Sequence, residues 1–130
     1  MKTTLRTIGT PGDAPHLLVM LPGMVMQPEA LFEAGFADAI AQRALPLDLL
    51  AIDVSGIGLD AADTWDALQN EILAPERARR TSVWLGGISL GGLVAMAHVA
   101  ARPGVLDGLC LLAPYPGSRP SVNVMDRAGG

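Results

Sequence analysis

The chain has 130 residues, half of them hydrophobic, and a formal net charge of −4. This size suits one domain with a sizeable core, and the acidic balance argues against nucleic-acid binding. No apolar run approaches the roughly 20 residues of a membrane span, and the amino terminus lacks the apolar stretch of a secretory signal, so we expect a cytoplasmic protein with no membrane partner. The single cysteine, Cys110, excludes an intrachain disulfide and a cysteine-based metal site, and its apolar neighbours predict a buried, inert thiol.

Short apolar runs alternate with stretches of helical length along the chain. This order predicts an α/β fold, a three-layer sandwich in which a mostly parallel sheet lies between helices. The first run alternates as a half-exposed edge strand does, while the second is continuously apolar, as in a central strand covered on both faces. The expected strands cover residues 3–8, 17–21, 47–52, 82–88 and 108–113.

Three helices are expected between these strands. The first begins near Pro28 and buries one face, because Phe32, Phe36 and Ile40 recur every four residues. The second is capped by Asp63 or Thr64, and Pro75 kinks or restarts it. Its side chains expected to face the sheet are Trp65, Leu68 and Ile72. The third covers residues 90–102 and is apolar on almost every side, which is typical of a helix buried within a larger protein.

The most informative segment joins the fourth strand to the third helix. Its residues Gly87-Ile88-Ser89-Leu90-Gly91 match G-x-S-x-G, the turn that raises a serine hydroxyl above the carboxyl end of a parallel strand. The serine of such a turn has strained backbone angles, and glycines let the strand and helix approach closely beside it. The alternative is a glycine-rich turn without chemistry. A nucleotide-binding loop is not expected, because neither glycine fingerprint of phosphate sites fits and no lysine is near.

A second loop supports the catalytic interpretation of this turn. Residues 21–25, Leu-Pro-Gly-Met-Val, end the other central strand, where a hydrolase would need a donor for its oxyanion. The amide of Leu90, at a helix N-terminus, and the amide of Met24 or Val25 would then converge on the developing negative charge. An ordinary turn at the end of a strand is the alternative for this loop.

The two loops and the succession of strands resemble the amino-terminal part of the α/β-hydrolase superfamily, over about residues 3–117. The resemblance implies that Ser89 is the nucleophile and that Leu90 and Met24 provide the oxyanion donors. The implied enzyme hydrolyses a small-molecule carboxylic ester or thioester through an acyl-enzyme, without cofactor or metal. Members of this superfamily carry their triad in the order serine, acid, histidine, with acid and histidine after later strands than those expected here.

Neither histidine of the chain is expected to serve as the base for Ser89, since a general base must approach within roughly 3 Å of the serine oxygen. His98 is nine residues further along the following helix, or about 13 Å, and should pack against the sheet. His16 precedes the strand that ends at the second loop, so it should lie at the surface about 20 Å away, at the opposite end of the sheet.

Three carboxylates remain as candidates for a triad acid. Asp53 leaves its strand on the side of Ser89 and is expected to order the glycine-rich loop after it. Asp107 enters its strand on the opposite side. Asp126, in the carboxy-terminal stretch where no regular element is expected, is the one weak candidate for the acid.

These observations predict one domain over residues 1–130 that is an incomplete hydrolase, without its acid and histidine. The fifth strand would then expose an unpaired apolar edge, which invites self-association. Two other functions remain open. One is a non-catalytic hydrolase-like half that binds a partner through this edge; the other is an acyltransferase on the same fold, since transfer differs from hydrolysis in how water is excluded.

Overall fold

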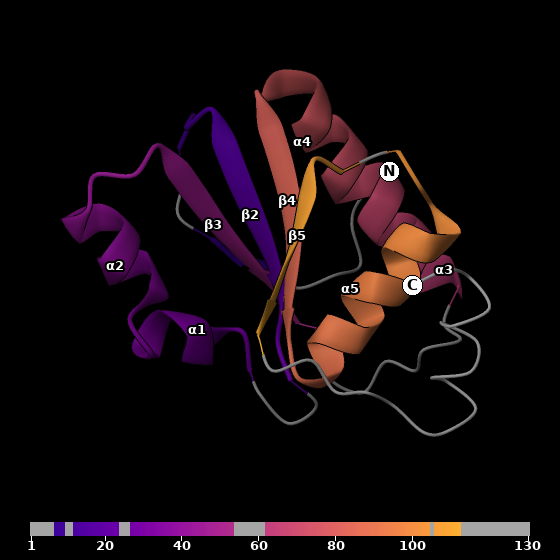
Figure 1. The fold of residues 1–130 in the computed structure, drawn as a ribbon, viewed down its shortest axis with the longest axis horizontal. Coiled ribbons are helices and arrows are strands. Elements are labelled where there is room, and N and C mark those ends of the chain that lie inside the picture. Colours follow the sequence, from indigo (N-terminus) through magenta and orange to yellow (C-terminus); the bar gives the residue numbers. More distant parts are fainter. Residues whose placement is uncertain (1–6, 10–11, 24–26, 54–61, 105, 113–130) are drawn as a thin grey trace.

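The computed structural model describes residues 7–9, 12–23, 27–53, 62–104 and 106–112. In this part of the chain a five-stranded sheet lies between two layers of helices (Figure 1). The strands are β1 (Thr7–Gly9), β2 (His16–Leu21), β3 (Leu47–Ile52), β4 (Ser82–Ile88) and β5 (Gly108–Leu112). Their order across the sheet is β1-β3-β2-β4-β5, with β1 antiparallel to β3 and all other pairs parallel. The predicted α/β class, with a mostly parallel sheet, is therefore confirmed.

The strand predictions agree closely with the structure. The bounds of β3 and β4 are those predicted, β2 begins one residue early, and β1 lies at an edge as expected. Residues 3–6 and Ala113, which were also expected in strands, lie outside the described residues. The strands are predictable because each is a short apolar run bounded by turn residues.

One face of the sheet carries two short helices in place of the single helix that was predicted. These are α1 (Glu29–Glu33), with Pro28 as its N-cap, and α2 (Phe36–Gln42). Gly35 separates them with φ 95°, a left-handed conformation that glycine adopts without steric cost. Phe32, Phe36 and Ile40 still pack toward the sheet, because the break preserves their common side.

The opposite face carries α3 (Ala62–Ala67), the π-helical segment η1 (Leu68–Leu73), α4 (Ala74–Arg79) and α5 (Leu90–Ala101). The first three follow one another directly without a break, and Pro75, where a kink or a restart was predicted, lies in the first turn of α4 just after the change from η1. Proline lacks an N–H group and therefore cannot make the α-helical hydrogen bond to the residue four positions earlier. The π-helical segment η1 lies directly before this proline. Trp65, Leu68 and Ile72 are buried as expected.

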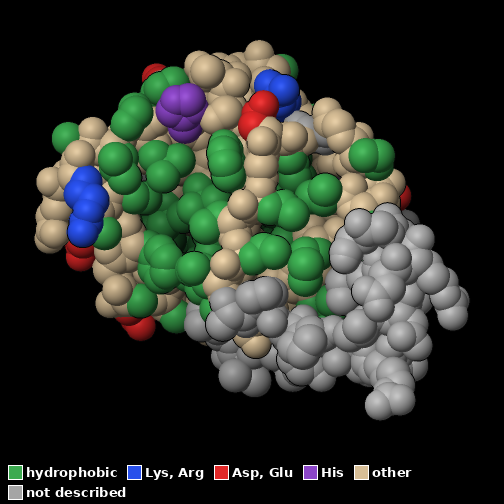
Figure 2. Space-filling model, in the orientation of Figure 1, with side chains coloured by type: hydrophobic (Ala, Val, Ile, Leu, Met, Phe, Trp, Pro, Cys, Tyr) green, Lys and Arg blue, Asp and Glu red, His purple; other side chains and the backbone are tan. Residues whose placement is uncertain are grey.

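The two faces of the sheet differ in how completely helices cover them. A core that includes Val19 and Leu85 lies under α3, η1, α4 and α5, whereas the core on the other face, under α1 and α2, centres on Met20 and Leu49. On this second face Trp84 of β4 is 41% exposed and Leu112 of β5 is 38% exposed. Figure 2 shows hydrophobic side chains lining a hollow there, between α2 and β5.

This hollow, which we call the Trp84 groove, has a volume of about 640 Å³. Its lining residues are His16, Leu18, Leu47, Ser82, Trp84, Asp107, Leu109 and Cys110. The indole of Trp84 lies over Gly108 of the neighbouring strand, where an added Cβ would come within 2.5 Å of it. The Cys110 thiol is only partly buried, because no described helix covers this half of the face, so the prediction of a buried cysteine is wrong.

The first half of helix α5 is buried on every side, as expected, because residues 91–95 are all buried. Its second half is buried on one side only, since His98 is buried while Ala97 and Ala100 are exposed. Among the helices of the described residues, none is both long and apolar enough to cross a membrane.

Candidate active site

The site lies at the carboxyl ends of β2 and β4, where the chain changes direction across the sheet. From β2 the chain continues through α1 and α2 to β3 on one side, and then returns across β2 to β4 on the other. Loops that diverge from two adjacent parallel strands in this way leave a crevice outside the carboxyl end of the sheet, which is where open α/β sheets bind ligands. Pro22 and Gly23 follow β2 at this point, and Ser89 follows β4.

Ser89 lies exposed in the turn between β4 and α5. Its backbone has φ 53° and ψ −115°, and Ala44 is the only other described non-glycine residue with positive φ. A non-glycine residue in such a conformation costs about 1–3 kcal/mol. Its amide donates to the carbonyl of Leu112 at 3.1 Å, so the end of β5 fixes the turn. The arrangement is a strained elbow that presents the serine hydroxyl to solvent.

The flanking glycines are required by close packing, as the sequence predicted. A Cβ on Gly91 would collide with the carbonyl oxygens of Leu21 and Pro22, and one on Gly87 would collide with the backbone of Gly91. The first turn of α5 therefore lies directly against the end of β2.

Only one of the two expected oxyanion donors can be placed. Leu90 is the first residue of the twelve-residue helix α5, so its amide has no acceptor within the helix and lies at the positive end of the helix dipole. The carbonyl of Ser89 accepts bonds from the amides of Gly92 and Leu93 at 3.0 and 3.3 Å. Met24 and Val25 lie outside the described residues, although Pro22 and Gly23 before them are buried beside α5.

His98 is buried and hydrogen-bonded to Gln69. It is 5% exposed, and its Nε2 lies 3.0 Å from Oε1 of Gln69 in η1, while its Nδ1 is buried without a hydrogen-bond partner. Burial is the largest of the causes that lower the pKa of His98 to about 4; the positive charge of Arg102 also lowers it, and the smaller effect of Asp66 opposes them. A buried neutral imidazole bound to Gln69 cannot take a proton from Ser89.

His16 lies at the amino end of the sheet, as predicted, but it is not a free surface residue. It is the first residue of β2 and pairs in register with Ser82, the first residue of β4. Its Nδ1 lies 2.6 Å from the Ser82 hydroxyl oxygen. This bond joins the amino ends of two adjacent parallel strands, at the end of β4 opposite to Ser89.

Two of the three candidate carboxylates lie in the described residues, and they lie at opposite ends of the sheet, as their strand positions suggested. Asp107, before β5, accepts the amide of Val83 at 2.8 Å and pairs with Arg77 at 3.1 Å, so its role at the amino end is structural. Asp53 follows β3 at the carboxyl end, but the loop that it was expected to order lies outside the described residues, as does Asp126. Within the described part of the chain, no group of three metal-ligating side chains occurs.

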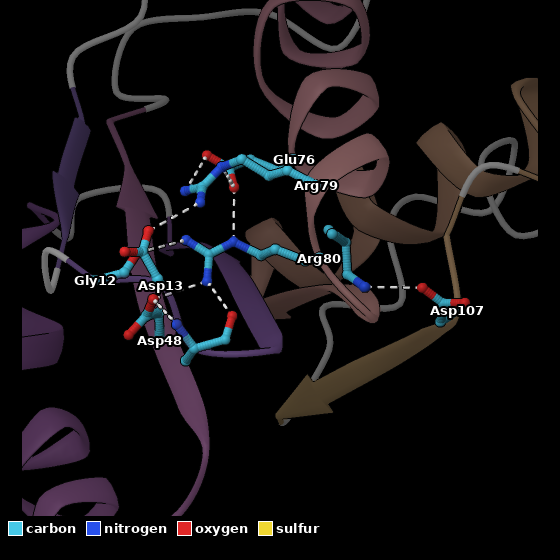
Figure 3. A network of polar contacts seen from close by, with 9 residues as sticks. Gly12, Asp13, Asp48, Glu76, Arg79, Arg80 and Asp107 are labelled. Carbon is cyan, nitrogen blue, oxygen red and sulfur yellow. Dashed lines mark hydrogen bonds and ion pairs between the residues drawn. The ribbon is translucent and has the colours of Figure 1, made fainter.

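A buried ion-pair network at the amino end of the sheet was missed by the sequence analysis (Figure 3). The guanidinium of Arg80 bonds Asp48 of β3 at 2.7 Å, Glu76 of α4 at 2.6 Å and the carbonyl of Ala14 at 2.8 Å. Burial acts to lower the pKa of Arg80, but the hydrogen bonds with Glu76 and Asp48 outweigh it and raise the pKa above its usual value. The available signal was Asp48 itself, a charged residue inside an otherwise apolar strand.

The model of the alpha/beta hydrolase family matches residues 18–129 of the chain. No curated protein matches at a significant level. Among solved structures, an N-formylmaleamic acid deformylase from Pseudomonas putida S16 is 24% identical, with a TM-score of 0.59 over 85% of this chain and 42% of that one. MenH from S. aureus is 22% identical, with a TM-score of 0.60 over 98% of this chain and 48% of that one.

A monoacylglycerol lipase from Paleococcus ferrophilus is 17% identical, with a TM-score of 0.61 over 99% of this chain and 51% of that one. The chain thus spans about half the length of these solved structures, and at these identities the likeness concerns the fold. The family match covers most of the chain, and the strained serine turn follows β4 as the fold requires. The protein belongs to the alpha/beta hydrolase family.

Proposed function

We propose that the protein is the nucleophile-bearing part of a serine hydrolase that acts on a carboxylic ester or thioester. The observation that carries this proposal is the elbow at Ser89: an exposed serine, positive φ, glycines at which an added Cβ would collide with backbone atoms, and the N-terminus of α5 beside it. The deformylase and the lipase among the similar structures are hydrolases by their names, which agrees with this class of reaction.

In the proposed reaction the Ser89 hydroxyl attacks the substrate carbonyl carbon and loses its proton to a general base. The negative charge that develops on the carbonyl oxygen is stabilised by the amide of Leu90 and by the dipole of α5, with Met24 as the second donor. The alcohol or thiol departs with a proton, and water then releases the acid from the acyl-enzyme.

The general base is proposed to come from outside these 130 residues, and so is the acid that orients it unless Asp126 provides that acid. His16 is bonded to Ser82 and His98 to Gln69, and these are the two histidines of the chain. Asp126 remains a weak candidate for the acid. Acyl transfer to an alcohol or amine would use the same elbow.

The test is labelling with a fluorophosphonate probe, which reacts with activated serines. In a lysate of the native source, we expect a labelled protein that is heavier than 13.5 kDa and carries the probe on Ser89. Replacing Ser89 with Ala should abolish labelling. The matched control is Ser82→Ala, since Ser82 has a histidine at 2.6 Å but lies at the other end of β4.

Label on Ser82, or labelling that persists in the Ser89→Ala variant, would contradict the proposal. If a natural 13.5 kDa species stays unlabelled while it still has a biological effect that Ser89→Ala does not alter, the protein is instead a non-catalytic module.

A further inference from the structure

A cavity lies between α3 and the second half of α5, on the face of the sheet opposite to the Trp84 groove (Figure 1). It has a volume of about 230 Å³, and we call it the Trp65 cavity. Its lining residues are Trp65, Val94, Ala97, His98, Ala101 and Arg102. All of them belong to α3 or to α5 and its C-cap, and none belongs to a strand. The cavity is therefore independent of what covers the edges of the sheet.

Small side chains on α5 create the space in this cavity. Residues 94, 97, 98 and 101 are three or four positions apart, so they share one side of the helix. Ala97 and Ala101 provide only a methyl group each, opposite the large indole of the buried Trp65. An ion pair between Arg102 and Asp66 holds α5 to α3 beside this space. The walls are thus mainly apolar and are joined by a charge pair.

His98 contributes a polar atom that lacks a partner. Its side chain is buried, and its Nδ1 makes no hydrogen bond within the described part of the chain. Its Nε2 lies 3.0 Å from Oε1 of Gln69. Because an amide oxygen only accepts, Nε2 carries the proton of the neutral ring and Nδ1 is a bare acceptor. A ligand that donates a hydrogen bond to Nδ1 would satisfy an atom that the protein itself leaves unsatisfied.

The geometry of the ring leaves Nδ1, not Nε2, for a ligand. The two nitrogens of an imidazole point in divergent directions, and Gln69, which holds Nε2, does not line the cavity. Neighbouring atoms cover Nδ1, and a small rotation about χ2, a torsion with broad energy wells, would turn it to the cavity surface.

The charges around the cavity favour a neutral ligand. Arg102 is the charged residue among the described lining residues, and Asp66 balances it. The imidazole of His98 is uncharged at neutral pH, since burial lowers its pKa to about 4. An anion would have to displace Asp66 from Arg102, and a cation would meet the guanidinium. A neutral molecule meets neither cost.

We propose that the Trp65 cavity binds a small neutral phenol, a molecule with one aromatic ring and one hydroxyl group. The ring packs against the indole of Trp65, as aromatic pairs do in offset or edge-to-face contact, and against Val94 and the alanines. The hydroxyl donates to Nδ1 of His98. An apolar cavity of about 150 Å³ already holds benzene, so this volume accommodates a substituted ring.

The test compares phenol with toluene, which has a methyl group in place of the hydroxyl. Both are titrated into the chain at pH 7, and the indole N–H signals of Trp65 and Trp84 are followed by NMR. We expect the Trp65 signal to shift with saturation, and phenol to bind about tenfold more tightly than toluene, because only phenol donates to Nδ1. A purely apolar cavity would prefer toluene, since phenol gives up its hydrogen bonds to water on entering it.

Two variants separate the acceptor from the space. His98→Phe keeps a ring but removes Nδ1, and it should abolish the preference for phenol. Ala97→Leu fills the cavity and should weaken binding of both ligands at least tenfold; it serves also if the phenylalanine variant does not fold. The matched control is Ala100→Leu, because Ala100 is exposed on the same helix and does not line the cavity. It should leave both affinities unchanged, and far-UV circular dichroism checks the fold of each variant.

A Trp65 signal that does not move at millimolar phenol would overturn the proposal, and so would a shift confined to Trp84. Equal or tighter binding of toluene would overturn it too, as would a preference for phenol that survives His98→Phe or binding that survives Ala97→Leu. None of these results depends on labelling of Ser89, so this proposal and the hydrolase proposal can fail separately.

Discussion

The two ends of the sheet differ in backbone strain, in burial and in side-chain bonding. At the carboxyl end Ser89 is exposed and strained, and the glycines around it provide no side chains to hold it. At the amino end the buried side chains of Arg80 and Asp48 form an ion pair, and His16 is hydrogen-bonded to Ser82. The same parallel strands thus carry an energetically costly turn at one end and satisfied ion pairs at the other. The amino end thus stabilises the fold, while the carboxyl end bears the chemistry in the proposed reaction.

The largest effect should come from the amino end. Replacing Arg80 with Ala leaves the Asp48 carboxylate, 8% exposed, without its cation, and we expect the free energy of unfolding to fall by about 3–5 kcal/mol in urea titrations. The matched control is Arg79→Ala, because the exposed Arg79 pairs with the exposed Asp13 and with Glu76 but not with Asp48. Its loss should stay under about 1 kcal/mol. Similar losses for both arginines would contradict this account.

His98, near the carboxyl end of α5, should make stability depend on pH. Its pKa is about 4 in the folded chain, because of burial, and about 6.5 when unfolded. The unfolded chain therefore binds the proton more tightly, so the contribution of His98 to stability is complete above pH 6.5 and falls by up to about 3 kcal/mol as the pH decreases to 4. Chemical denaturation of wild type and His98→Gln, compared across this range, should show the extra loss in wild type alone; parallel pH profiles would exclude it.

At the carboxyl end, packing of the elbow should be sensitive to one methyl group. Gly91→Ala places a Cβ against the carbonyl oxygens of Leu21 and Pro22, and we expect a loss of about 1–3 kcal/mol together with weaker fluorophosphonate labelling. Gly104→Ala is the control, because Gly104 has φ 86° but open space around it. It should cost about 1 kcal/mol through backbone strain and leave labelling unchanged. Equal labelling of the two variants would count against the close packing.

The smallest expected effect is a difference in stability between two substitutions of Ser89, which measures the backbone strain of this residue apart from its chemistry. Both Ser89→Ala and Ser89→Gly should lose labelling, but glycine tolerates φ 53° and ψ −115° whereas alanine retains the strain. We expect the glycine variant to be the more stable of the two by about 1 kcal/mol, measured by thermal denaturation. If alanine were as stable as glycine here, the turn would store no strain.

The elbow and the strands could be predicted because their signals are local. A strand followed by glycines around a serine has few alternatives, and apolar runs between turn residues gave β3 and β4 their exact bounds. The helix break at Gly35 was missed because the four-residue spacing of Phe32, Phe36 and Ile40 continues across it. A glycine inside a helical pattern does not reveal whether its φ will be positive.

Features that depend on distant pairing could not be predicted. The bond between His16 and Ser82 needs the register of β2 against β4, and the bonds of Arg80 join segments 32 and 66 residues apart. The exposure of Cys110 depends on which part of the sheet the helices cover, and an apolar sequence around a cysteine carries no such information.

The packing of Trp84 over Gly108 gives the protein two distinct optical reporters. The chain has two tryptophans: Trp65 of α3 is 8% exposed and belongs to the core, while Trp84 of β4 is 41% exposed. A neutral quencher such as acrylamide should therefore extinguish the emission of Trp84 well before that of Trp65. The emission of the unmodified chain can then distinguish filling of the Trp84 groove from unfolding of the core, without an added label.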